Sequence, residues 1–118
     1  MIVLLWGFLS CARQDPVQQE LMQLHDRTIP AGANLVEKSR LIRNDFSATA
    51  TWIFETDMDW ESYTTWVTSN LPTYTLVSGR MKLRLLKKLA GDIFELQIEP
   101  SITGNAQRIR VNFQAHPY

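Results

Sequence analysis

The stretch that decides the fold lies at residues 47–55, which read SATATWIFE. Its side chains alternate, with Ala48, Ala50, Trp52 and Phe54 on one side and Thr49, Thr51, Ile53 and Glu55 on the other. A period of two, rich in β-branched and aromatic residues, predicts a strand with one buried face. We therefore expect the folded core to begin near Ser47.

A helix is expected directly after this strand. Apolar residues recur at helical spacing, so one face of the helix should pack on a sheet; they are Trp60, Tyr63, Trp66, Val67 and Leu71. Thr56 and Asp57 offer capping oxygens at its start. Pro72 cannot continue a helix and ends it.

Segments with period two fill the rest of the chain. Residues 81–85, 94–98 and 109–115 alternate apolar with polar or charged side chains, and residues 90–92 predict a turn. Clean alternation is typical of antiparallel sheets with one solvated face. The pattern predicts a two-layer α+β fold, with one main helix packed on an antiparallel sheet of about four or five strands in β-α-β-β-β order. It leaves open whether Tyr74 to Lys88 forms one strand or two.

The region before residue 46 carries weaker signals. Residues 17–26 predict a short helix, and residues 28–34 contain Pro30 and Gly32, which break it. We therefore divide the chain into a leader at 1–11, a tether with an irregular lead-in at 12–45, and a folded domain at 46–118. The length of 118 residues suits a single domain.

The leader reads MIVLLWGFLSCA over residues 1–12. Its apolar run is too short to span a bilayer and has the length of a signal-peptide core. Leu9-Ser10-Cys11 resembles the lipobox of bacterial lipoproteins, and the layout of the whole chain resembles small bacterial lipoproteins. Two features depart from that pattern, because no Lys or Arg precedes Arg13 and because Phe8 stands where the lipobox has an aliphatic residue. The resemblance implies lipidation at Cys11, with the domain held at the cell envelope and facing the periplasm or the exterior. Otherwise the segment is an N-terminal core element or a hydrophobic anchor to a partner.

Composition limits the function classes. Lys and Arg number 12, and Asp and Glu number 12, so the net charge is zero and nucleic-acid binding is not expected. One cysteine and two distant histidines, His25 and His116, give no metal-ligand spacing and no nucleophile-base arrangement. We expect no enzyme activity, no cofactor and no metal, and we expect both histidines to be solvated.

Two charged clusters remain as candidate sites. The basic candidates for binding a polyanion or a partner are Arg80, Lys82, Arg84, Lys87, Lys88, Arg108 and Arg110. Cross-strand pairing with Glu95 and Glu99 is the alternative explanation of this run. The acidic residues Asp57, Asp59 and Glu61, beside Trp60, form either a ligand or catalytic site or the capping end of the helix. Trp52 and Trp66 are expected in the core, and Trp60 is the tryptophan of the domain most suited to exposure.

Three functions are compatible with these observations. The first is a membrane-tethered, exported accessory or binding protein without catalytic activity, whose partners are the membrane and a protein. The second is a structural subunit of a larger membrane complex, with an uncleaved N-terminus. The third is a small-ligand binder or enzyme that uses the acidic cluster.

Overall fold

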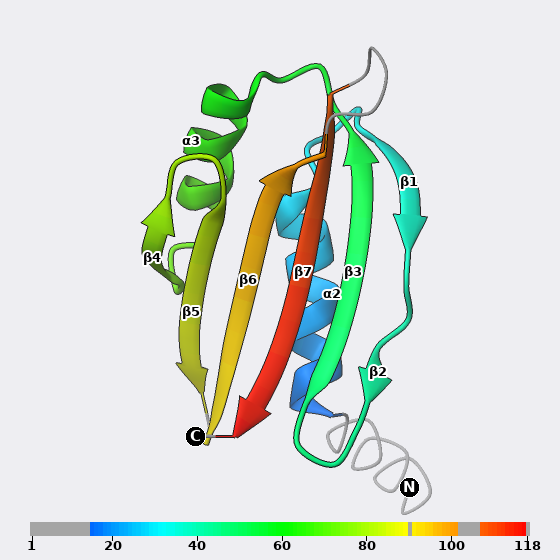
Figure 1. The fold of residues 1–118 in the computed structure, drawn as a ribbon, viewed down its shortest axis with the longest axis vertical. Helices are drawn as coiled ribbons and strands as arrows, with labels where there is room; N and C mark the ends of the chain where they lie inside the picture. Colours follow the sequence, from blue (N-terminus) through cyan, green and yellow to red (C-terminus); the bar gives the residue numbers. More distant parts are fainter. Residues whose placement is uncertain (1–14, 90, 102–106, 118) are drawn as a thin grey trace, which may run out of the picture.

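One antiparallel sheet of seven strands forms the body of the computed structural model, which describes residues 15–89, 91–101 and 107–117 (Figure 1). The elements in chain order are α2 (Pro16–Thr28), β1 (Asn34–Lys38), β2 (Ile42–Arg43), β3 (Ala48–Glu55), α3 (Trp60–Asn70), β4 (Thr75–Gly79), β5 (Leu83–Leu89), β6 (Asp92–Pro100) and β7 (Arg108–Pro117).

The strand order across the sheet is β1-β3-β7-β6-β5-β4, and β2 also pairs with β3. Strands β4 to β7 form a meander in which each strand pairs with the next. The predicted strand β3 pairs along its whole length with β7, from Ala48 opposite Ala115 to Glu55 opposite Arg108. After β3 the chain passes through α3 and enters β4 at the opposite edge of the sheet (Figure 1).

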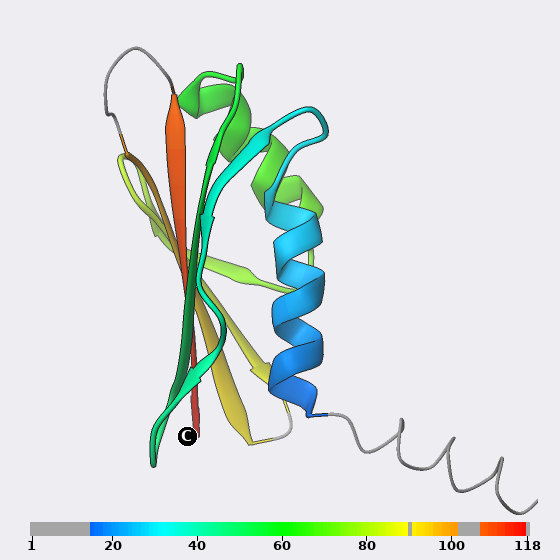
Figure 2. The same ribbon diagram turned by 90° about the vertical axis from the view of Figure 1, so that its right-hand side faces the viewer.

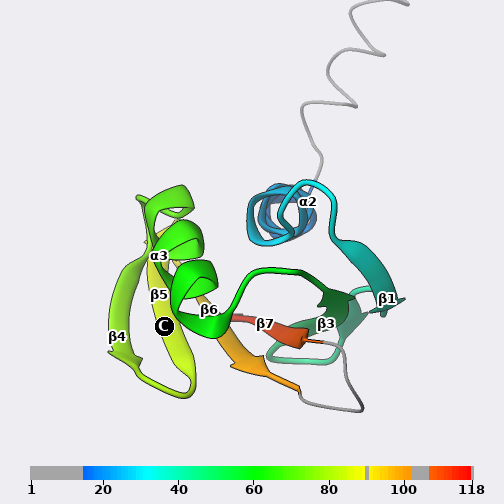
Figure 3. The same ribbon diagram turned by 90° about the horizontal axis from the view of Figure 1, so that it is seen from above.

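Both helices lie on the same face of the sheet (Figures 2 and 3). The alternation of β3 is realised residue by residue: Ala48, Ala50, Trp52 and Phe54 are buried, and the side chains between them, Ile53 included, are half-buried. Trp52, Phe54 and Phe113 are at most 1% exposed beneath the helices. Burial of each such large side chain stabilises the fold by about 1.5–3 kcal/mol.

Thr28, at the end of α2, connects the helices to the sheet and is fully buried. Its hydroxyl donates to the carbonyl of Leu24 at 2.7 Å and accepts a hydrogen bond from the indole Nε1 of Trp52 at 2.9 Å. Its own carbonyl accepts a hydrogen bond from the hydroxyl of Tyr63 in α3 at 2.7 Å. One residue of α2 thus bonds to both β3 and α3.

The predicted fold class was wrong. Strand accounts for 47% of the described residues and helix for 25%, so the fold is mostly β, with seven strands and two helices in that part of the chain rather than four or five strands and one main helix. Tyr74 to Lys88 contains two strands, β4 and the greater part of β5.

The missing elements have a common physical cause. Strands β1, β2 and β4 are exposed at every residue, so they carry no alternation of buried and exposed positions. Helix α2 does form where a short helix was predicted, but its buried Leu21 and Leu24 belong to the main core. The folded unit therefore includes α2, β1 and β2, which lie in the stretch assigned to a tether.

Candidate functional site

The sheet face opposite the helices is covered by no other element among the described residues (Figures 2 and 3). We call it the open sheet face. It is formed by the side chains that alternate with the core residues of β3, β5, β6 and β7. Most of them are polar or charged: Thr49, Thr51, Glu55, Arg84, Lys88, Glu95, Gln97, Glu99, Arg108, Arg110, Asn112 and Gln114.

Ion pairs run across this face between neighbouring strands. Arg108 contacts Glu55 at 2.9 Å, and Arg110 contacts Glu99 at 3.8 Å. The side chains of these pairs are about one-third to two-fifths exposed, between 30% and 43%. Pairs of this kind contribute little individually, on the order of 0.2–1 kcal/mol. They fix the arginine heads on the face and neutralise them.

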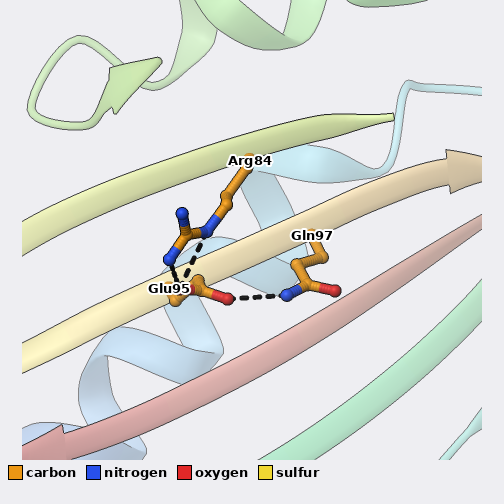
Figure 4. Close-up of polar contacts among 3 residues, drawn as sticks. All are labelled: Arg84, Glu95 and Gln97. Atoms are coloured by element: carbon orange, nitrogen blue, oxygen red, sulfur yellow. Dashed lines mark hydrogen bonds and ion pairs between the residues drawn. The ribbon is translucent and has the colours of Figure 1, made fainter. Parts of the chain in front are cut away.

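Glu95 lies at the centre of the open sheet face and is only 7% exposed. Its Oε1 accepts hydrogen bonds from Nε and Nη2 of Arg84 at 3.2 and 3.0 Å, and its Oε2 accepts one from Nε2 of Gln97 at 2.7 Å (Figure 4). Burial raises the pKa of the Glu95 carboxyl, but the hydrogen bonds from Gln97 and Arg84 outweigh it, and the pKa lies below its ordinary value. Glu95 is thus held as a charged, preorganised acceptor group.

A shallow hollow of about 170 Å³ lies beside Glu95. Its polar lining comes from three strands: Thr49, Thr51, Glu95, Gln97, Asn112 and Gln114. The hydroxyl of Thr51 donates to Oδ1 of Asn112 at 2.9 Å, which orients that amide. Ligand pockets usually enclose about 300–1,000 Å³. The hollow suits a polar side chain or backbone group of a partner better than a whole small molecule.

The seven basic candidates do not form one patch. Arg84, Arg108 and Arg110 lie on the open sheet face in the ion pairs just described, so the cross-strand pairing expected from the sequence is present. Lys88 points to the same face. Arg80 and Lys82 are exposed in the β4–β5 turn. Lys87 faces the helices and pairs with Glu20 at 3.1 Å.

Glu20 and Lys87 belong to a buried polar network that the sequence analysis missed. Glu20 in α2 is 7% exposed and also accepts a hydrogen bond from the hydroxyl of Tyr74 at 2.8 Å. Burial and then the hydrogen bond to Glu20 raise the pKa of the Tyr74 hydroxyl. The ammonium of Lys87 lies 5.5 Å from the centre of the Tyr74 ring. Glu20 lies on the same helix face as Leu24, and this spacing could have indicated that Glu20 faces the core. It was not considered because residues 12–45 were assigned to a tether.

The acidic cluster caps α3. Asp59, rather than Thr56 or Asp57, is the N-cap, and its carboxylate accepts a hydrogen bond from the backbone N–H of Ser62 at 2.7 Å. That hydrogen bond lowers the pKa of Asp59. Within residues 15–89, 91–101 and 107–117, no group of three potential metal ligands comes together.

Trp60, in the first turn of α3, is half-buried. Its Nε1 donates to the carbonyl of Arg80 at 2.6 Å, and its ring stacks on Tyr63. Trp52 is buried as predicted, and Trp66 is half-buried. The ring of Trp60 therefore joins the start of α3 to the β4–β5 turn.

The prediction that both histidines are solvated was wrong for His25. It packs against the ring of Trp52 with centroids 5.6 Å apart, and its Nε2 is buried without a hydrogen-bond partner. Burial, and then the charge of Lys38, lower its pKa, while Asp26 acts in the opposite direction. His116, at the end of β7, is half-buried and contacts the carbonyl of Pro117 through Nδ1 at 3.2 Å.

Cys11 and the rest of the leader lie outside the described residues. In the part of the chain that the structure does describe, neither helix combines the length and the apolar character needed to cross a bilayer. Comparison with protein-family models, with curated proteins and with solved structures finds no match to this chain.

Proposed function

We propose that the protein is an exported accessory protein without catalytic activity, tethered to the cell envelope by a lipid on Cys11 and binding a polar protein partner through the open sheet face. The observation that carries the proposal is the short separation along the chain between Cys11 and the first residue of the folded domain. Asp15 caps α2 at Val17, and it lies four residues after Cys11.

This separation supports direct anchoring of the domain. Four residues span at most about 14 Å when fully extended. A lipid on Cys11 would therefore hold the start of α2 at the bilayer surface, without the long tether expected from the sequence.

The open sheet face supports a binding role. Its carboxylates are engaged by arginines and amides, which gives a fixed pattern of donors and acceptors. Preorganised polar groups of this kind favour specificity for a partner with complementary charges. Asp59, from the acidic cluster, is used for capping, which favours the open sheet face over that cluster as the binding site.

Intact mass spectrometry of the protein purified from the membranes of a bacterial host with lipoprotein processing tests the proposal. We expect a species that begins at Cys11 and carries acyl mass. Cys11→Ser is the matched control and should yield no acylated species. An unmodified chain beginning at Met1 would refute lipid anchoring and favour the structural-subunit alternative, in which the uncleaved leader contacts partner chains.

A further inference from the structure

The loop between β2 and β3, residues 44–47, displays an aromatic side chain on a fixed turn. Oδ1 of Asn44 accepts hydrogen bonds from the backbone N–H groups of Phe46 and Ser47 at 3.2 and 2.8 Å. The N–H of Asn44 donates to the carbonyl of Ser47 at 2.9 Å. Phe46 is 79% exposed, the highest value among the large hydrophobic residues of the described chain. The loop therefore holds this ring out of the core.

This loop lies at the end of the molecule where α2 begins (Figure 2). Arg43 of β2 forms an ion pair with Asp15, the residue that caps α2. A hollow at this end is lined jointly by Asp15, by the β2–β3 loop, by Asp92 and by the end of β7. Two further exposed apolar side chains lie at the same end, Ile42 beside the loop and Leu89 before the β5–β6 turn.

We infer that this end of the molecule is a membrane-contact surface, in which Phe46 inserts into the interfacial region of the bilayer that anchors Cys11. The inference rests on the proposed lipidation. Because Cys11 lies within about 14 Å of Asp15, the loop that Asp15 contacts through Arg43 must also stay near the bilayer. Aromatic and aliphatic side chains bind membranes by burying apolar area at the boundary of headgroups and acyl chains. The exposed ring of Phe46 at this end thus has a defined occupant, the lipid.

The contact would also orient the binding site. β3 runs away from this end, from Ala48 near the loop to Glu55 at the far end (Figures 1 and 2). With the loop on the bilayer, the strands extend away from the membrane surface, and the open sheet face is exposed to solvent beside them. Glu95 and the hollow beside it then remain accessible to a partner.

Site-specific quenching in vesicles tests the inference on the full, processed protein. Cys11 is the single cysteine of the chain, and in the acylated protein a cysteine introduced elsewhere is the free thiol. A fluorescent label is placed at Asp45→Cys, in the loop, or at Asp57→Cys, beyond the far end of β3. The eight residues of β3 separate the two sites by about 26 Å. The protein is reconstituted in vesicles of phosphatidylethanolamine and phosphatidylglycerol that contain a lipid with a shallow quencher.

We expect quenching at position 45 to exceed quenching at position 57 several-fold. Phe46→Ser should lower the quenching at position 45, because the lipid on Cys11 then holds this end near the bilayer without an inserted ring. Met81→Ser should leave the quenching at position 45 unchanged, because Met81 is 74% exposed but lies in the β4–β5 turn at the other end of the sheet. Equal quenching at both positions, or quenching at 45 that Phe46→Ser leaves unchanged, would overturn the inference. The acyl mass of the same preparation separates the two proposals: acylated protein without the difference refutes the membrane contact alone, and unacylated protein refutes both.

Discussion

Replacing Thr28 with Val tests whether α2 is part of the fold or part of a tether. Val has nearly the same shape, so the substitution removes the hydroxyl and leaves the packing. The indole Nε1 of Trp52 then loses its acceptor in a region where both residues are at most 1% exposed. A buried donor left without a partner costs about 1–3 kcal/mol.

The free energy of unfolding should therefore fall by about 1–3 kcal/mol in Thr28→Val, measured by urea denaturation. For a domain of this size each kcal/mol corresponds to a shift in Tm of roughly 4–8 °C. Thr28→Ser is the matched control, since it keeps the hydroxyl and removes one buried methyl group, at a cost of about 1 kcal/mol. The N–H proton of the Trp52 indole, followed by NMR, should lose its protection from exchange in the Val variant and keep it in the Ser variant.

The opposite outcome is equally clear. If the free energy of unfolding of Thr28→Val lies within about 0.5 kcal/mol of that of the parent protein, as is usual for surface substitutions, then α2 does not pack on β3 as described. The same result would return residues 12–45 to the role of a tether. A larger loss in Thr28→Ser than in Thr28→Val would show that the methyl group matters, and not the hydrogen bond.

Three further predictions follow from named contacts. Asp59→Ala should lower the midpoint of urea denaturation, because the N-cap of α3 is lost, and Asp59→Asn, which keeps an acceptor oxygen, should lower it less. Unchanged stability in the Ala variant would reopen the acidic cluster as a ligand site. The pKa of His25 is lower in the folded protein than in the unfolded chain, so the unfolded chain binds the proton at a higher pH. The free energy of unfolding should therefore fall as the pH drops below about 6.5, and His25→Gln should reduce the dependence of that free energy on pH in denaturation experiments. An unchanged pH dependence would contradict the burial of His25 against Trp52. Lys87→Met should lower the free energy of unfolding by up to about 3 kcal/mol, because the buried Glu20 carboxylate is left without its cation. Adding Glu20→Gln to this variant should recover part of the loss. If the effects of the two substitutions simply add in chemical denaturation, the two side chains are not coupled.

Local patterns predicted the centre of the molecule well. The alternation at 48–55 specified which face of β3 is buried, because a strand in a half-covered sheet exposes every second residue to water. The spacing of Tyr63 and Val67 likewise specified the buried side of α3. Cross-strand pairing, the alternative explanation of the basic residues, is present in the ion pair between Glu99 and Arg110, since these residues are directly opposed in the register.

Other features could not be predicted, because they depend on residues distant in the chain. The network of Glu20, Tyr74 and Lys87 joins positions up to 67 residues apart, and neither its burial nor its partners leave a local pattern. His25 is a polar residue near one end of the chain and was expected in solvent, yet its ring packs against Trp52 of β3 and its Nε2 is buried.

The sequence by itself determined the main strands, the helix at α3 and the polar character of the open sheet face, because each is encoded in the periodicity of neighbouring side chains. Only the tertiary structure decided that α2 joins the core and that β1, β2 and β4 complete a seven-stranded sheet. Edge strands are held by backbone hydrogen bonds to a neighbour and expose both faces, so their pairing is independent of side-chain alternation. For the same reason, the position of Phe46 beside the start of α2 became visible only once β2 was paired with β3.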